Sequence, residues 1–149
     1  MSEDPCRLRS NYSFQRRWES PISDFSLQFY LEGSRRGNIG DALLHIDSEK
    51  KCIQWDEFYP LIQHPDLKHQ GYGTQAMVLC LEILVKNVEC IAKFTVTHSS
   101  PISTDRRKQL RKMNIDPAQS LVFSEYQKRV QDYCGKLQKK YDRELQSSQ

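Results

Sequence analysis

The chain has 149 residues and a formal net charge of only +3, with 22 Lys and Arg against 19 Asp and Glu. A chain of this length buries roughly two-thirds of its unfolded surface around one core, so we expect a single domain over residues 1–149. Apolar residues make up 38% and charged residues 28%, which excludes a disordered protein. No apolar run approaches the roughly 20 residues that cross a bilayer, and residues 1–10 carry no apolar signal core, so we predict a cytoplasmic protein.

Cysteine and histidine spacing gives no sign of a disulfide framework or a metal site. The cysteines are odd in number and contain no CxxC pair, and the histidines contain no HExxH pattern. We therefore expect reduced thiols, with Cys80 and Cys90 in the core, and no metal. The cysteines are Cys6, Cys52, Cys80, Cys90 and Cys134, and the histidines are His45, His64, His69 and His98.

The first half of the chain predicts an N-terminal arm followed by three strands. Residues 1–24 are polar, and the spacing of Phe14 and Trp18 indicates a short helix that pins this arm to the core. Period-two alternation predicts a strand over 25–31 and a second over 38–46. A third strand follows near 51–63 and contains Pro60, which cannot donate a ladder hydrogen bond, so we expect the sheet to be disturbed there.

The second half alternates helices with one more strand. An apolar stripe predicts a helix over 74–87, formed by Met77, Val78, Leu81, Leu84 and Val85. A strand is expected over 90–97, followed by a short, strongly basic helix over 103–113. Asp116 and Pro117 predict the start of a long final helix, over 116–146. Its apolar stripe consists of Phe123, Tyr126, Val130, Tyr133 and Leu137. The fold class is therefore α/β (α+β), with the order β-β-β-α-β-α in a core over 25–115 and a long C-terminal helix.

The segment richest in chemistry joins the third strand to the first long helix. It reads His64-Pro-Asp-Leu-Lys-His-Gln-Gly-Tyr-Gly-Thr74. Glycines let a backbone approach an anion closely, and a helix N-terminus adds unpaired N–H donors and a positive dipole end. The segment lacks the spacing of a P-loop or of a dinucleotide-binding fingerprint. It therefore predicts a phosphate cradle of another kind.

Over about residues 38–115 the chain resembles the GNAT acetyltransferases. The family joins a strand to a helix through [Arg/Gln]-x-x-Gly-x-[Gly/Ala], and here Lys68 stands at the first position of that pattern. The resemblance implies a mixed, mostly antiparallel sheet and acetyl-CoA or CoA as cofactor. It also implies that Leu61 and Gln63 offer backbone groups to the pantetheine arm. The remaining residues that it implies for cofactor binding are Lys68, His69, Gln70, Gly71, Tyr72, Gly73, Thr74 and Ser103.

Glu57 is the candidate general base, at a position that resembles the catalytic glutamate of the histone-acetylating branch. An amine must lose a proton before it attacks a thioester, and a carboxylate in partly apolar surroundings can have its pKa raised toward neutrality. Period two places Glu57 on the face that carries Ile53, Trp55 and Tyr59. A structural role, as an ion-pair partner of Lys51, explains the same residue.

The position at which the family carries its general acid differs in this chain. Where the family carries a tyrosine on the helix after the next strand, this chain has Leu110, which cannot donate a proton. Tyr126 and Tyr133 on the final helix are the candidates to replace it. The acceptor amine, whether a small molecule, a protein lysine or an N-terminus, is not indicated by any residue.

Three functions remain open at this point. The first is an N-acetyltransferase with Glu57 as base and an unidentified amine acceptor. The second is a catalytically silent GNAT-fold protein that forms a homodimer or binds a protein partner through the stripe of the final helix. The third is a nucleic-acid-binding protein that uses the basic residues of the helix over 103–113, a role that the low net charge disfavours. These residues are Arg106, Arg107, Lys108, Arg111 and Lys112.

Overall fold

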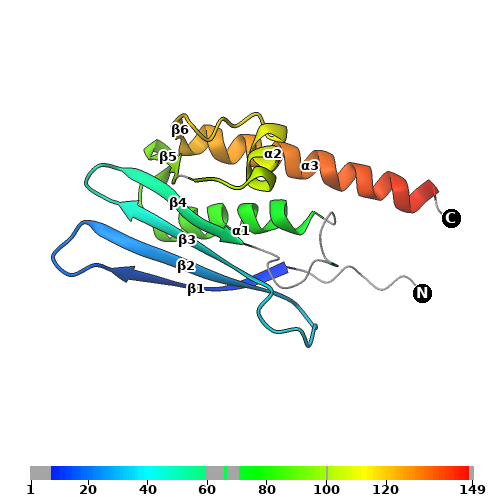
Figure 1. Cartoon of the computed structure of the whole chain (residues 1–149), viewed down its shortest axis with the longest axis horizontal. Coiled ribbons are helices and arrows are strands. Elements are labelled where there is room, and N and C mark those ends of the chain that lie inside the picture. Colours follow the sequence, from blue (N-terminus) through cyan, green and yellow to red (C-terminus); the bar gives the residue numbers. More distant parts are fainter. Residues whose placement is uncertain (1–7, 60–65, 67–70, 100, 148–149) are drawn as a thin grey trace.

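One mixed sheet of six strands organises the chain, in the order β1-β2-β3-β4-β5-β6 (Figure 1). The computed structural model describes residues 8–59, 66, 71–99 and 101–147. Neighbouring strands are antiparallel except β4 and β5, which are parallel. The strands are β1 (Leu8–Arg16), β2 (Ile22–Leu31), β3 (Gly40–Asp47), β4 (Cys52–Tyr59), β5 (Thr95–His98) and β6 (Leu121–Val122). The expected mixed, mostly antiparallel sheet is confirmed.

Three α-helices complete the described part of the fold. They are α1 (Tyr72–Asn87), α2 (Thr104–Lys112) and α3 (Phe123–Ser147), and a short 3-10 helix, η2 (Ile91–Lys93), precedes β5. Figure 1 shows α1 lying between the sheet and α3, whose last turns project beyond the other elements. None of the helices in the described part of the chain is both long enough and apolar enough to cross a membrane.

The strands predicted from period-two alternation are confirmed in β2 and β3. Phe25, Leu27 and Phe29 alternate with exposed or half-buried residues along β2 and are buried. Their counterparts on β3, Ala42 and Leu44, are buried on the same side of the sheet. Alternate side chains of a strand point to one face, so this pattern alone determines which face meets the helices.

Residues 8–16 of the N-terminal arm form a strand, and the prediction of a short helix between Phe14 and Trp18 is wrong. Residues 8–16 pair with β2 along their whole length. The Phe14 ring stacks on Phe25 with centroids 4.4 Å apart. Without β1, β2 would present a free edge of N–H and C=O groups, and pairing satisfies those groups. Trp18 follows β1 in a turn and is 89% exposed.

A β-bulge in β4 overturns the predicted environment of Glu57. Leu43 pairs with Glu57 and Leu44 pairs with Trp55, so Asp56 is an extra residue on β4. One extra residue reverses the alternation beyond it. Phe58, opposite the buried Ala42, therefore continues the core-facing side, while Glu57 is exposed on the other side from Trp55.

The helix α1 provides the crossover that a parallel pair of strands requires. It begins at Tyr72, two residues before the predicted start, with Gly71 as its N-cap. Met77, Cys80 and Leu81 are buried as predicted. Val85 was expected in the same stripe but is 48% exposed, because it lies at the edge of the buried side.

The region between α1 and α2 differs from its prediction in one respect. The predicted strand over 90–97 is shortened to β5 because η2 takes up its first half, and Cys90, expected in the core, is exposed at the N-cap of η2 with φ 56°. The helix predicted over 103–113 is confirmed as α2, capped by Ser103, whose hydroxyl accepts a hydrogen bond from the Arg106 amide.

The final helix starts at Phe123, so the predicted start at Asp116 and Pro117 is wrong. The Asp116 carboxylate accepts a hydrogen bond from the Ala118 amide, but only a turn follows. Residues 121–122 pair with β5 as β6, and the Phe123 amide donates to the Phe94 carbonyl 2.7 Å away. Strand pairing therefore overrides the local capping signal.

Candidate functional site

The parallel strands β4 and β5 separate at one point in the middle of β4. Their register runs from Cys52 beside Thr95 to Trp55 beside His98. The Ser99 amide then donates to the Trp55 carbonyl 2.8 Å away. Beyond this hydrogen bond β4 continues to Tyr59, whereas β5 ends at His98 and the next helix, α2, begins at Thr104. The bulge at Asp56 lies where the two strands part, because an extra residue bends the strand that carries it.

A small cavity of about 60 Å³ lies at this separation. Its lining comes from β4, from the end of β5 and from the start of α2. The lining residues are Trp55, Asp56, Glu57, Phe58, Tyr59, His98, Ser99, Pro101, Ile102, Ser103 and Arg106. On one side Asp56 is held in place, because its carboxylate accepts from the Ser99 hydroxyl at 3.2 Å and lies 3.1 Å from His45 Nε2.

Arg106 is the cation of this cavity, and it lies against two aromatic rings of β4. Its Cζ atom is 4.2 Å from the centroid of the Phe58 ring and 5.1 Å from that of Trp55. Nη1 donates to Gln109 Oε1 at 2.7 Å and approaches Met77 Sδ at 3.0 Å. Burial lowers the pKa of Arg106, but a guanidinium keeps its charge in proteins. A positive charge is therefore held against aromatic faces at the base of α2.

His98 and Tyr126 form a second polar pair behind the cavity. His98 Nε2 lies 2.9 Å from the Tyr126 hydroxyl, and the Trp55 ring stacks against both rings, at 6.4 Å and 6.3 Å. Burial, and then the charge of Arg106, lowers the pKa of His98 from 6.5 to about 3. Burial also raises the pKa of Tyr126. Both groups are therefore neutral at pH 7.

The lowered pKa of His98 predicts a loss of stability in acid. The unfolded chain binds a proton at this residue below about pH 6.5 and the folded protein does not until about pH 3, so stability is fully present above pH 6.5 and falls below it. Between about pH 7.5 and pH 5 we expect the free energy of unfolding of the wild type to fall by about 2 kcal/mol more than that of His98→Gln.

Urea unfolding of both proteins at several pH values measures this difference. Every other titratable group is present in both proteins and therefore cancels in the comparison. Parallel pH profiles would show that His98 is not held neutral by the fold.

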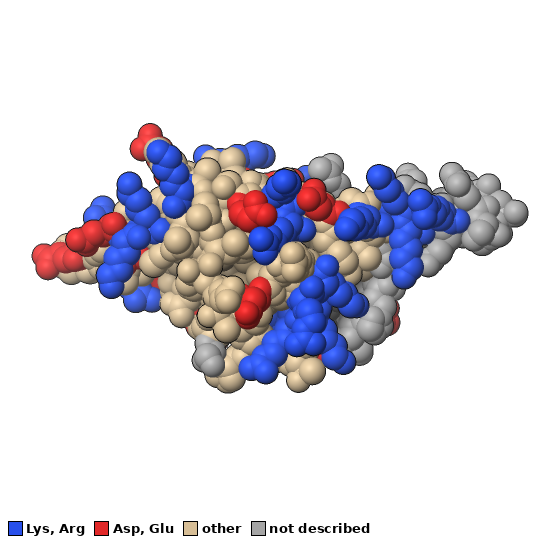
Figure 2. All heavy atoms as spheres, turned by 90° about the horizontal axis from the view of Figure 1, so that it is seen from above, with Lys and Arg blue, Asp and Glu red and all other residues tan. Residues whose placement is uncertain are grey.

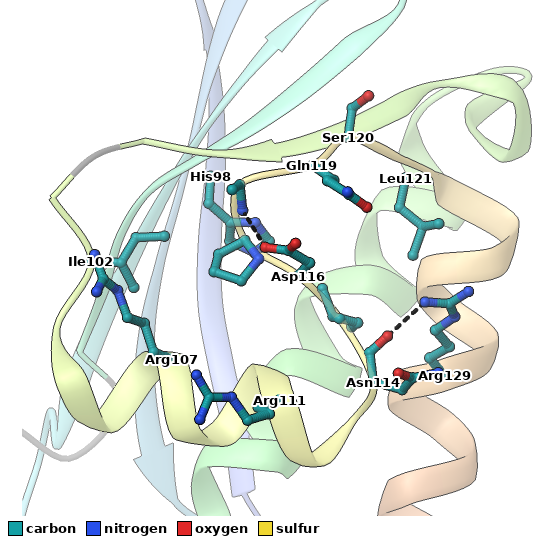
Figure 3. A pocket seen from close by; sticks show the side chains of 13 residues that line it. His98, Ile102, Arg107, Arg111, Asn114, Asp116, Gln119, Ser120, Leu121 and Arg129 are labelled. Atoms are coloured by element: carbon teal, nitrogen blue, oxygen red, sulfur yellow. Dashed lines mark hydrogen bonds between the residues drawn. The ribbon is translucent and has the colours of Figure 1, made fainter.

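A larger cavity of about 910 Å³ shares two lining residues, His98 and Ile102, with the small cavity (Figure 3). Arg107 and Arg111 of α2 border it, and Arg129 of α3 borders it from the opposite side. Arg129 Nη1 donates to the Asn114 carbonyl at 2.6 Å, so its position is fixed. Figure 2 shows that Lys and Arg side chains gather on the face that carries α2 and α3. Negatively charged molecules are attracted to such a face.

The structure brings some of the predicted site residues together. Glu57 and Ser103 line the small cavity, and Tyr126 lies behind it, in contact with His98. Gly71 is the N-cap of α1, and Tyr72, Gly73 and Thr74 form its first turn. The other predicted cofactor-binding residues, Leu61, Gln63, Lys68, His69 and Gln70, lie outside the described residues.

Three residues of the site were not recognised from the sequence: Trp55, His98 and Arg106. They are distant along the chain and belong to three elements, so no spacing connects them. Arg106 was assigned to a surface cluster of basic residues, but its side chain is largely buried. The available signal was the position of Arg106 three residues after the capping Ser103, which places it in the first turn of α2.

Within residues 8–59, 66, 71–99 and 101–147, no group of three or more His, Cys, Asp or Glu side chains could hold a metal ion. Comparison of the chain with protein-family models, with curated proteins and with solved structures found no match.

Proposed function

We propose that this protein is an N-acetyltransferase that moves an acetyl group from acetyl-CoA to an amine. The observation that supports it most strongly is the separation of β4 from β5 beyond Trp55 and His98, with a cavity at that point. Separated strands leave backbone N–H and C=O groups without ladder partners. The amide groups of an extended pantetheine arm match such groups. The resemblance to the GNAT family leads to the same activity.

The N-terminus of α1 offers a place for the CoA pyrophosphate. Gly71 has φ 83°, a left-handed conformation that suits glycine, and among the described residues no side chain caps the helix. The first turn of α1 carries no acidic residue. The glycine backbone and the positive end of the helix dipole favour an anion at this point.

Glu57 and Tyr126 are proposed as base and acid. Glu57 lines the small cavity and is exposed to solvent, so it can take a proton from an approaching amine and release it to water. Tyr126 is fully buried, and its hydroxyl lies against His98. A proton from Tyr126 would therefore reach the departing thiolate through His98, which lines the cavity.

Isothermal titration with acetyl-CoA tests this proposal, with variants at Gly73. Gly73 lies in the first turn of α1 and its φ is not positive, so a side chain there causes no backbone strain. We expect micromolar binding by the wild type and at least a hundredfold loss in Gly73→Asp, because a carboxylate would meet the pyrophosphate.

Gly73→Ala is the matched control and should keep its affinity to within a few fold. Aspartate in the first turn also favours the helix dipole, so Gly73→Asp should remain folded. A folded wild type that does not bind acetyl-CoA, or equal affinities in all three proteins, would contradict the proposal.

The two other functions find less support. Phe123, Tyr126 and Val130 of the α3 stripe are buried within the chain, which leaves only its second half for a protein partner. Arg106 is largely buried against aromatic rings, which leaves fewer basic side chains of α2 on the surface for a nucleic-acid backbone.

A further inference from the structure

Three buried side-chain nitrogen atoms have no hydrogen-bond partner among the described residues, and all three belong to residues that line the small cavity. They are Trp55 Nε1, His98 Nδ1 and Arg106 Nη2. Buried polar groups in folded proteins are nearly always hydrogen-bonded, and each exception calls for an explanation. Three exceptions around one cavity indicate a missing acceptor at that place.

The carboxylates of Asp56 and Glu57 also line the cavity, but neither forms an ion pair with Arg106. Within the described part of the chain no carboxylate forms an ion pair with Arg106, whose partners are an amide oxygen, a thioether, two ring faces and the Tyr126 hydroxyl. Removing a guanidinium from water without an opposite charge costs several kcal/mol. The missing acceptor is therefore expected to be an anion.

The three nitrogen atoms act as donors. Trp55 Nε1 and Arg106 Nη2 carry hydrogen and cannot accept. His98 is neutral, and the Tyr126 hydroxyl next to its Nε2 can donate to that nitrogen. With Nε2 as the acceptor, the single proton of the ring is on Nδ1. Three residues of the lining then carry unpartnered donors, one of them charged, whose nitrogen atoms have almost no exposed surface, and Trp55 and Phe58 supply aromatic walls.

We propose that this cavity binds a small carboxylate group, with Arg106 as its ion-pair partner and Trp55 and His98 as additional hydrogen-bond donors. A carboxylate is planar and accepts several hydrogen bonds, which suits a guanidinium fork between flat rings. A volume of about 60 Å³ admits a group of this size.

The proposed function gives this site a substrate class. If the acyl group of the donor enters the cavity, an acyl chain that ends in a free carboxylate pairs with Arg106, whereas an acetyl group leaves the cation unpaired. The preferred donor is then the CoA half-thioester of a short dicarboxylic acid, such as a succinyl group. This step depends on the acetyltransferase proposal, but the carboxylate site itself does not.

The indole N–H signals of the two tryptophans test the carboxylate site directly. In a ¹H–¹⁵N correlation spectrum of the full chain, addition of sodium succinate should move the Trp55 indole signal in a saturable manner. Trp18, which is 89% exposed, is the internal reference, and a Trp18→Phe variant assigns the two signals. Sodium chloride at matched ionic strength controls for the salt effect.

Arg106→Gln should weaken the succinate response at least tenfold, because the charged donor is lost. Lys108→Gln removes the same charge from an exposed position of the same helix and should leave the response unchanged. Circular dichroism shows whether each variant is folded. If Arg106→Gln does not fold, His98→Gln replaces it, with the same expectation of a weaker response.

A Trp55 signal that succinate does not move, or an equal response in folded Arg106→Gln, would overturn the carboxylate site and leave water as the occupant of the cavity. Titration of succinyl-CoA and acetyl-CoA separates the two proposals. Tighter binding of succinyl-CoA that Arg106→Gln abolishes supports both. Succinate binding without any CoA binding supports the carboxylate site and refutes the transferase. Equal binding of both thioesters without succinate binding supports the transferase and refutes the carboxylate site.

Discussion

Replacing Glu57 by glutamine is expected to lower the turnover number by about 10²–10⁴, while the affinity for acetyl-CoA stays nearly unchanged. Glutamine has almost the same shape as glutamate but cannot accept a proton from the attacking amine. Glu57 lines the cavity where β4 and β5 separate, and it lies on the exposed side of the bulge. The loss should therefore appear in the chemical step and not in cofactor binding.

The measurement is the release of CoA thiol in the presence of a panel of amines, which includes polyamines, amino acids and a lysine peptide. Glu49→Gln makes the same chemical change at an exposed turn between β3 and β4 and is expected to keep full activity. A fully active Glu57→Gln enzyme would exclude Glu57 as the base and would leave water or another group at the cavity to take the proton.

Replacing Trp55 by alanine is expected to lower the free energy of unfolding by about 3–5 kcal/mol. The ring is only 3% exposed. It stacks on His98 and Tyr126, contacts Phe58 edge to face, and lies under the Arg106 guanidinium. Its removal would create a cavity in the core and leave a buried cation with one aromatic partner fewer.

Urea unfolding of Trp55→Ala, compared with Trp18→Ala, checks this prediction. Trp18 is almost completely exposed, so its removal should change the free energy of unfolding by less than about 0.5 kcal/mol. Similar small losses in both variants would show that the stacked cluster around Trp55 does not contribute to stability.

Periodic patterns predicted the elements that depend on local sequence. The alternation around Phe25 and Leu44 identified β2 and β3, and the stripe around Met77 identified α1, because a buried face imposes its period on the residues that form it. The helix predicted over 103–113 is α2, and the structure caps it with the Ser103 hydroxyl, which acts within its own turn.

The predictions that were wrong depended on partners distant in sequence. Phe14 and Trp18 are spaced as on a helix, but residues 8–16 pair with the edge of β2 and form the strand β1. The helix-capping signal at Asp116 produces only a turn, because residues 121–122 pair with β5 as a strand. Strand pairing satisfies a row of backbone groups at once, and this outweighs the local preference of a few residues.

In the candidate site, too, some features follow from the sequence and others only from the tertiary structure. Sequence alone determined that the chain carries a glycine-rich loop before a helix, a carboxylate at Glu57 and a run of basic residues at 106–112. Only the tertiary structure decided that Asp56 forms a bulge, that Glu57 lies outside the core-facing side of β4, and that Arg106 is buried against Trp55. A bulge and a buried cation arise from the packing of β4, β5 and α2 against one another. No local sequence pattern predicts that packing, because each of the three segments is compatible with several partners until the sheet has formed.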